Sequence, residues 1–209
     1  MEEMKFALDT FYAIMSGALV MWMAAGFTML EAGLVQKKDV SEIVTKNLGL
    51  FSIACVMYLV CGFALMYPAD AVFAIAGGLD EAGEAISYGI FPAIATSWGL
   101  STDMPLEEIG MAYGMNYSQQ ADFFFQVVFV ATAMSIVSGA VAGRMKLIPF
   151  FIFTVILTAF IYPVQGYWNW GGGFLSVLGY SDYAGSGTVH LLGAAAALGV
   201  VTLLGARNG

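Results

Sequence analysis

Residues 123–147, FFFQVVFVATAMSIVSGAVAGRMKL, contain an apolar stretch with no charged side chain from Phe123 to Gly143. The hydrocarbon core of a bilayer is about 30 Å thick, and a helix needs roughly 20 residues to cross it. Arg144 and Lys146 follow directly and would stop the span at a polar boundary. The stretch therefore predicts a transmembrane helix and indicates the fold class of the whole chain.

The composition agrees with a membrane protein. Hydrophobic residues make up 60% of the 209 residues and charged residues 11%, whereas a soluble domain has about 25% charged residues. Four further stretches are long and apolar enough to cross the bilayer. We therefore predict an all-α membrane protein, one domain over residues 1–209, with five transmembrane helices at about 6–34, 48–66, 123–143, 147–167 and 184–204.

The distribution of charge predicts the orientation. Segment 68–122 carries eight acidic residues and no Lys or Arg. Cytoplasmic loops are enriched in Lys and Arg, so this segment and the amino terminus are expected outside the cell, and the carboxyl end of the chain inside. The acidity is typical of a solvated loop; attraction of cations to the outer face is the alternative. The basic residues assigned to the inner side are Lys37, Lys38, Lys46, Arg144, Lys146 and Arg207.

Several function classes lack their motifs in this sequence. There is no Walker loop, no GxGxxG pattern, no zinc-type spacing and no basic patch for nucleic acid. We therefore expect no enzymatic activity, no resident cofactor or metal and no nucleic-acid partner. Small residues are abundant instead: Gly139 and Gly143 form a GxxxG pair, and Gly193 begins a run of alanines, a pattern typical of closely packed membrane helices.

The only histidine, His190, lies inside the fifth predicted span. An ionisable group in a span is costly and usually faces a pathway or a partner. A neutral imidazole has one donor and one acceptor and can share a proton in an apolar passage; a structural hydrogen bond to a neighbouring helix is the alternative. Asp182, eight residues earlier, could cap the start of the span or attract a cation.

Aromatic residues gather near the predicted outer ends of two spans. Trp168 and Trp170 precede three glycines in WNWGGGF, and Phe125 and Phe129 are spaced to share one helix face. Each ring alone fits an ordinary interfacial belt. Together they could hold a small cation over their π faces, with a contribution of about 0.5–2 kcal/mol.

The chain resembles the amino-terminal half of the ammonium transporter family, which includes methylammonium permeases and the Rhesus proteins. The resemblance lies in AGFTMLEAGLVQKKD and TKNLG, in the 123–147 stretch, and in YPVQGYWNWGGGFLSVLGYSDYAGSGTVHLLG, residues 162–193. It covers nearly the whole chain except 68–121, which is longer and more acidic than the corresponding family loop. Its implied fold is the first of two inverted repeats.

The resemblance implies roles for individual residues. Trp170 matches the tryptophan of the outer ammonium-recruitment site, and Phe129, four residues after Phe125, matches one of two phenylalanines that gate the pore. Asp182, in DYAG, matches the aspartate that supports the recruitment site without contacting the ion. His190 matches the first of two pore histidines that share a proton.

The resemblance also implies a mechanism and partners. Potassium resembles ammonium in size and charge but has no proton to release, so an apolar pore selects ammonium by passing neutral ammonia. We expect ammonium transport in the cell membrane, with methylammonium as an analogue and a homotrimeric assembly. The second half of the family is missing, so a truncated portion of a transporter is expected. An ammonium sensor on the same scaffold and a non-transporting membrane fragment are the alternatives.

Overall fold

The computed structural model describes residues 2–68, 71–79, 85–92 and 117–207. Within these residues, five helical segments are long and apolar enough to cross a membrane. The predicted helical membrane fold is therefore confirmed. The five segments are Glu3–Leu34, Lys37–Met66, Gln119–Val141, Leu147–Val177 and Ser186–Leu204.

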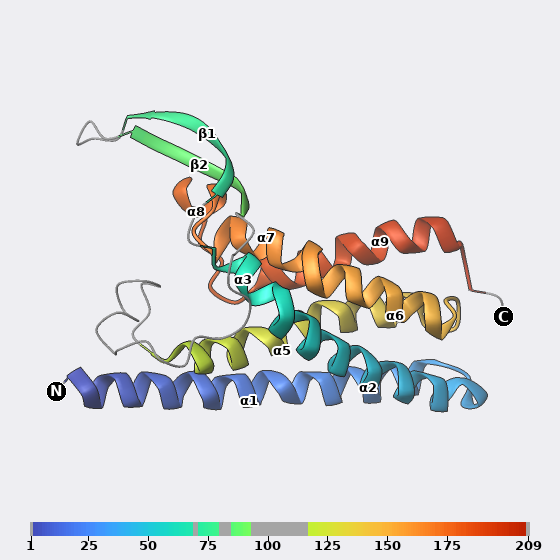
Figure 1. The fold of residues 1–209 in the computed structure, drawn as a ribbon. Coiled ribbons are helices and arrows are strands. Elements are labelled where there is room, and N and C mark those ends of the chain that lie inside the picture. The colour runs from blue at the N-terminus through green and yellow to red at the C-terminus, as the bar shows by residue number, and fades with distance from the viewer. Residues whose placement is uncertain (1, 69–70, 80–84, 93–116, 208–209) are drawn as a thin grey trace.

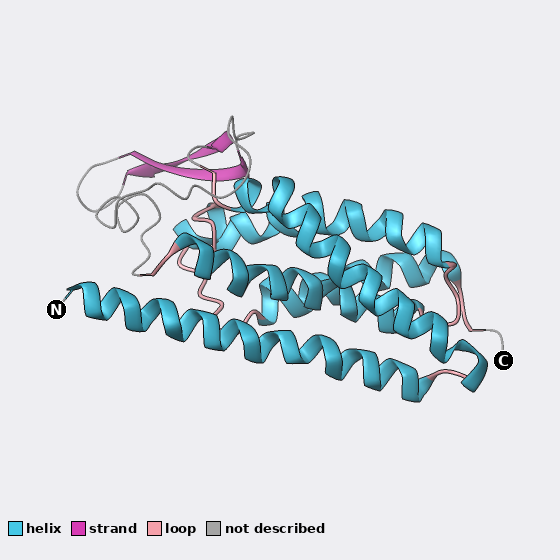
Figure 2. Cartoon of the chain, turned by 60° about the horizontal axis from the view of Figure 1, so that its bottom comes forward, coloured by secondary structure: helices cyan, strands magenta, loops and turns pink. Residues whose placement is uncertain are grey.

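The segments run side by side in a bundle (Figures 1 and 2). α1 is one long helix, and α5 lies against α1, α2 and α9. Three segments contain a π-helical turn, labelled η2, η3 and η4. In chain order the elements are α1 (Glu2–Leu34), η1 (Lys37–Asp39), α2 (Val40–Met57), η2 (Tyr58–Gly62), α3 (Phe63–Met66), β1 (Ala71–Leu79), β2 (Ala85–Pro92), α5 (Gln119–Val141), α6 (Leu147–Ile156), η3 (Leu157–Ile161), α7 (Tyr162–Asn169), α8 (Phe174–Val177), η4 (Ser186–Leu191) and α9 (Leu192–Leu204).

The bundle has two distinct ends. The start of α1, the hairpin β1–β2 and the start of α5 lie at one end, called the hairpin end below (Figure 1). The opposite end, called the basic end, carries five of the seven basic residues next to the helix termini. They are Lys37, Lys38, Arg144, Lys146 and Arg207.

The second span begins earlier than the sequence predicts. The sequence predicts a start at residue 48, with Lys46 in the connection between the first two spans, but α2 begins at Val40 and contains Lys46. The Lys46 side chain is only 3% exposed and forms an ion pair with Glu31 of α1. A paired charge can lie inside a bundle where an unpaired one would end the span.

Segment 68–122 contains structure that the sequence analysis did not predict. Strands β1 and β2 pair as an antiparallel hairpin, with Ala71 opposite Pro92 and Leu79 opposite Ala85. Asp122 does not belong to a solvated loop: it lies in the first turn of α5 and is fully buried. The other seven acidic residues of this segment lie outside the described residues.

The core is built around α5, which supplies more than half of its own side chains to the interior. Gly193 of α9 permits close packing, because a Cβ there would lie 2.8 Å from the Ala133 carbonyl oxygen of α5. The GxxxG prediction fails at its second residue. Gly143 lies beyond the end of α5 with a φ of 68°, so it turns the chain and does not pack a helix face.

Candidate functional site

Trp170 is positioned by a glycine turn at the hairpin end. It follows α7, and the three glycines after it let the chain reverse in very little space. A Cβ at Gly171 would collide with the Met66 carbonyl oxygen, and Gly172 has a φ of 79°, which favours glycine. The WGGG sequence is therefore required by backbone geometry as well as by its aromatic ring.

Asp182 links this turn to the helix that carries His190. Its carboxylate accepts hydrogen bonds from the backbone N–H groups of Ser186, Gly187 and Thr188 at 2.9, 2.9 and 2.7 Å. Its backbone carbonyl accepts the Trp170 Nε1–H at 2.9 Å. Burial opposes ionisation of Asp182, but the hydrogen bonds from Thr188, Gly187 and Ser186 outweigh it and lower the pKa of the carboxyl below its usual value.

This geometry bears on the two interpretations of Asp182. The carboxylate holds the free N–H groups at the start of η4, which is the capping arrangement. Both of its oxygens are occupied by these donors. Asp182 thus acts as a fixed support for Trp170 and η4.

His190 lies on the π-helical turn η4. Gly185 precedes this turn with a φ of 76°, and its carbonyl oxygen accepts the backbone N–H of both Val189 and His190. The imidazole Nδ1 lies 3.3 Å from the same oxygen. Because a carbonyl oxygen only accepts, this contact assigns the proton to Nδ1 and leaves Nε2 as an acceptor in the neutral ring. The side chain is exposed on the surface of this chain.

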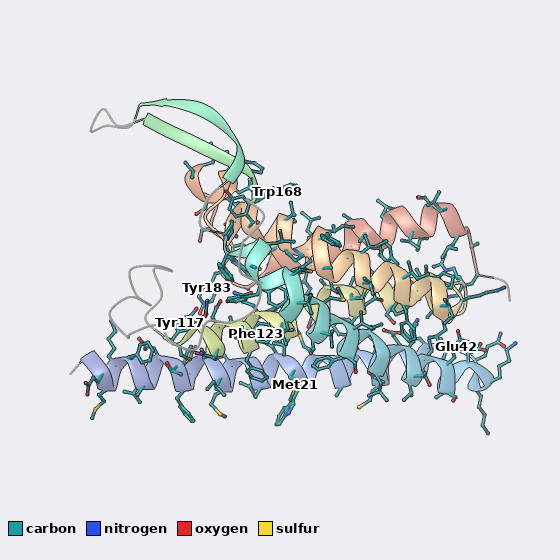
Figure 3. All side chains as sticks on the ribbon, viewed as in Figure 1. Met21, Glu42, Tyr117, Phe123, Trp168 and Tyr183 are labelled. Carbon is teal, nitrogen blue, oxygen red and sulfur yellow. The ribbon has the colours of Figure 1, made fainter. Side chains whose placement is uncertain are left out.

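The predicted aromatic residues form a connected group. The Phe125 and Phe129 rings meet edge to face with centroids 5.0 Å apart, and the Phe129 and Trp170 rings with centroids 5.9 Å apart. The rings border an open hollow of about 320 Å³ at the hairpin end. Figure 3 shows Tyr117 and Tyr183, two further residues of its wall, at this end of the molecule. Its remaining wall residues are Tyr67, Gln126 and Ala184.

The structure thus brings together four of the five predicted site residues. Trp170, Phe129 and Phe125 are in ring contact, and Asp182 holds Trp170 by a hydrogen bond. His190 is joined to them through the backbone of η4, which Asp182 caps. Trp168 packs elsewhere, with its ring 5.5 Å from that of Phe174.

Sequence reasoning missed the polar residues of the hollow. Tyr117 donates its hydroxyl to Asp122 Oδ1 at 3.3 Å. Burial, the nearby Asp122 carboxylate and this hydrogen bond raise the pKa of Tyr117 well above its ordinary value, so the hydroxyl remains a donor. The only signal in the sequence was Asp122 itself, a carboxylate adjoining an apolar run.

Sequence reasoning also missed a buried ionic cluster nearer the basic end. Glu31 Oε2 accepts hydrogen bonds from Ser138 Oγ at 2.7 Å and from Asn47 Nδ2 at 3.2 Å, and it lies 3.6 Å from Lys46 Nζ. Lys46 also donates to the Ser138 carbonyl oxygen at 2.9 Å. The cluster ties α1, α2 and α5 together by polar contacts that the surrounding apolar helices could not provide.

Comparison with known proteins gives consistent matches. The model of the Ammonium Transporter Family matches residues 11–209. Ammonium transporter Amt2 of Archaeoglobus fulgidus is 38% identical over 218 residues, which cover 100% of this chain and 41% of that protein. Forty-three curated proteins match in all.

Solved structures give the same result for the fold. A protein described as a sensor Amt protein superposes with a TM-score of 0.81 at 28% identity, covering 99% of this chain and 46% of that one. Mep2 of Candida albicans superposes with a TM-score of 0.77 at 23% identity, covering 99% of this chain and 41% of that one, and this likeness concerns the fold alone. The chain spans less than half the length of each of these three proteins.

Proposed function

Because the chain belongs to the ammonium transporter family, we propose that the protein carries ammonium or ammonia across a cell membrane, with these residues supplying one side of the pore. The observation that carries the proposal is the connected group of Trp170, Phe129 and Phe125 above the turn that holds His190. No soluble cofactor chemistry is needed for this activity.

The outer step of the mechanism is recruitment of the cation. The hollow at the hairpin end offers the π faces and edges of three rings, and each face can attract a small cation by about 0.5–2 kcal/mol. Trp170 cannot turn freely, because its Nε1–H is held by the Asp182 carbonyl oxygen. A fixed and weak site of this kind binds ammonium without retaining it.

The second step is passage past the phenylalanines. A charge at the centre of a membrane span costs at least about 2.5–3.5 kcal/mol, so ammonium is expected to give its proton to water in the open hollow before neutral ammonia passes Phe129. Ammonia then meets the Nε2 acceptor of His190, to which it can donate an N–H. Potassium would bind at the rings but has no proton to lose, which gives the selectivity.

The charge pattern supports an orientation for this path. The basic end carries Lys37, Lys38 and Arg144, and the positive-inside rule places it in the cytoplasm. The hairpin end and the amino terminus would then lie outside, so the aromatic hollow opens to the exterior. Insertion of a cysteine next to Met4 and next to Arg207, followed by labelling of intact cells with an impermeant maleimide, tests this orientation.

The exposure of His190 supports the view that the pore needs a second wall. An ionisable side chain at membrane depth is expected to face protein or a cavity and not lipid. In the family that wall is a second inverted repeat, and pores of such folds lie between the repeats. We propose that the native gene product continues into such a repeat and assembles as a homotrimer in the bilayer, and that these residues are a truncated portion of it.

Uptake of radiolabelled methylammonium tests the proposal. The native gene product should restore uptake in cells that lack their own ammonium carriers, and His190→Ala should reduce it at least tenfold. Leu203→Ala, which truncates an 89% exposed side chain on α9, is the matched control and should leave uptake unchanged. Binding of methylammonium without uptake would favour the sensor alternative, and neither binding nor uptake would favour a non-transporting fragment.

A further inference from the structure

The two buried carboxylates at the hairpin end have very different partners. Both carboxylate oxygens of Asp182 accept hydrogen bonds from backbone N–H groups at the start of η4. Asp122 is 0% exposed, and the Tyr117 hydroxyl donates a hydrogen bond to its Oδ1 at 3.3 Å. Asp122 thus interacts with side chains of the wall of the hollow, whereas Asp182 is held by backbone N–H groups.

The second oxygen of Asp122 is not satisfied by the described residues. The Tyr67 and Gln126 side chains lie close enough to the carboxylate to interact with it as hydrogen-bond donors. Among the residues that the structure describes, however, Oδ2 has no partner within hydrogen-bond geometry. An unsatisfied buried charged group is costly, so its retention needs a reason beyond packing.

Among the described residues no basic side chain forms an ion pair with Asp122, and Lys5, at the start of α1, is exposed. The sequence contains no Lys, Arg or His between Lys46 and Arg144, and Lys46 is already paired with Glu31. In the described part of the chain, this Lys46–Glu31 contact is the ion pair that forms. The described residues thus provide Asp122 with hydrogen-bond donors but with no positively charged partner.

The neighbours of Asp122 are also the polar wall of the aromatic hollow. Tyr67, Tyr117 and Gln126 line the hollow together with Phe129 and Trp170. Gln126 is 6% exposed, and its Oε1 has no hydrogen-bond partner within the described residues although the side chain faces the hollow. A cation in the hollow would be separated from the buried Asp122 carboxylate by these polar side chains of the wall.

We propose that Asp122 is the charged group that makes this hollow attract cations, acting from behind the wall that Tyr67, Tyr117 and Gln126 form. The inference rests on the proposed function and assigns the electrostatic part of recruitment to Asp122, while Asp182 serves as a support. A merely structural role is the competing explanation, because an acidic residue in the first turn of α5 also interacts favourably with the helix dipole.

The decisive variant is Asp122→Asn in the native gene product. Asn has the same shape and keeps an oxygen for the Tyr117 hydroxyl, but it carries no charge. If Asp122 attracts the cation, the KM for methylammonium should rise roughly three- to tenfold while the maximal rate stays within about twofold. Glu3→Gln removes an exposed carboxylate at the start of α1, at the same end of the bundle as Asp122, and should leave both values unchanged.

The outcomes separate this inference from the proposed function. If the wild-type protein takes up no methylammonium, the proposed function fails. If it does, and a correctly assembled Asp122→Asn variant keeps the wild-type KM, the inference about Asp122 is overturned and transport stands. Asp122→Ser provides the same measurement if the Asn variant does not assemble. If neither variant assembles, Asp122 is a structural residue and the inference is overturned.

Discussion

Replacement of Lys46 by methionine should destabilise the bundle more than any exposed charge change does. The ammonium nitrogen of Lys46 lies 3.6 Å from Glu31 Oε2, and both side chains are 3% exposed. Methionine fills a similar volume without the charge. Glu31 would then remain buried in the bundle, and its hydrogen-bond partners in the described part of the chain would be Asn47 and Ser138.

The magnitude follows from the geometry of the pair. At an effective dielectric constant of about 20, two unit charges at 3.6 Å attract by about 5 kcal/mol. Removing one partner of a buried pair typically costs about 3–5 kcal/mol, because the other charge is left uncompensated. The lost hydrogen bond from Lys46 to the Ser138 carbonyl oxygen is part of that cost.

The assay heats the purified protein in detergent to a series of temperatures and measures, by size-exclusion chromatography, the fraction that stays monodisperse. The midpoint is the temperature at which half of the protein is lost from that fraction. Lys46→Met should lower the midpoint by several degrees or prevent assembly. Lys38→Met, at an exposed position of the same end, is the matched control and should change it little. The double variant Glu31→Gln with Lys46→Met should recover much of the loss, since no buried charge is left unpaired. If Lys46→Met were as mild as Lys38→Met, the buried pair would not hold the helices together and the reasoning would be wrong.

Three further predictions use the same thermal assay. Gly193→Ala should lower the free energy of unfolding by about 1–3 kcal/mol, because the new Cβ meets the Ala133 carbonyl oxygen. Gly199→Ala, where nothing lies within 4 Å of the new Cβ, should be neutral or stabilising by about 0.5–1 kcal/mol. Equal effects of the two variants would contradict the close approach of α9 to α5. The pKa of Asp182 in the folded protein lies below its usual 3.8, so the ionised carboxylate stabilises the fold fully above pH 3.8, and this stabilisation is lost as the pH falls through the folded pKa. Asp182→Asn should therefore show a smaller fall in thermal midpoint below about pH 4 than the wild type, and an unchanged pH profile would refute the role of this carboxylate. Trp170→Phe keeps an aromatic ring but deletes the hydrogen bond to the Asp182 carbonyl, and it should cost about 0.5–1.5 kcal/mol; no change in midpoint would show that this bond does not hold the turn.

The paired roles of Asp122 and Lys46 show how a charge count can mislead in a membrane protein. The sequence assigned Asp122 to a solvated loop and Lys46 to a connection between spans, because charged residues normally stay at the polar boundary. Both are buried in helices. Their partners, such as Tyr117 for Asp122 and Glu31 for Lys46, decide whether burial is tolerated.

The sequence by itself determined that there are five helical spans, that the only histidine lies in the fifth span, and that Phe125 and Phe129 share a helix face. These features are local, because a run of about 20 apolar residues crosses a bilayer whatever its neighbours are, and residues four apart share a helix face. The resemblance in the WGGG and DYAG segments added the candidate roles of Trp170 and Asp182.

Only the tertiary structure decided which hydrogen-bond and ion-pair partners each buried charged side chain has. The buried cluster brings Glu31 together with Ser138, which is 107 residues away in the sequence. The hollow combines side chains from α5, from the end of α7 and from the chain before η4. The cost of a buried charge depends on the donors within about 3 Å of each oxygen, and those donors come from segments that no local pattern relates.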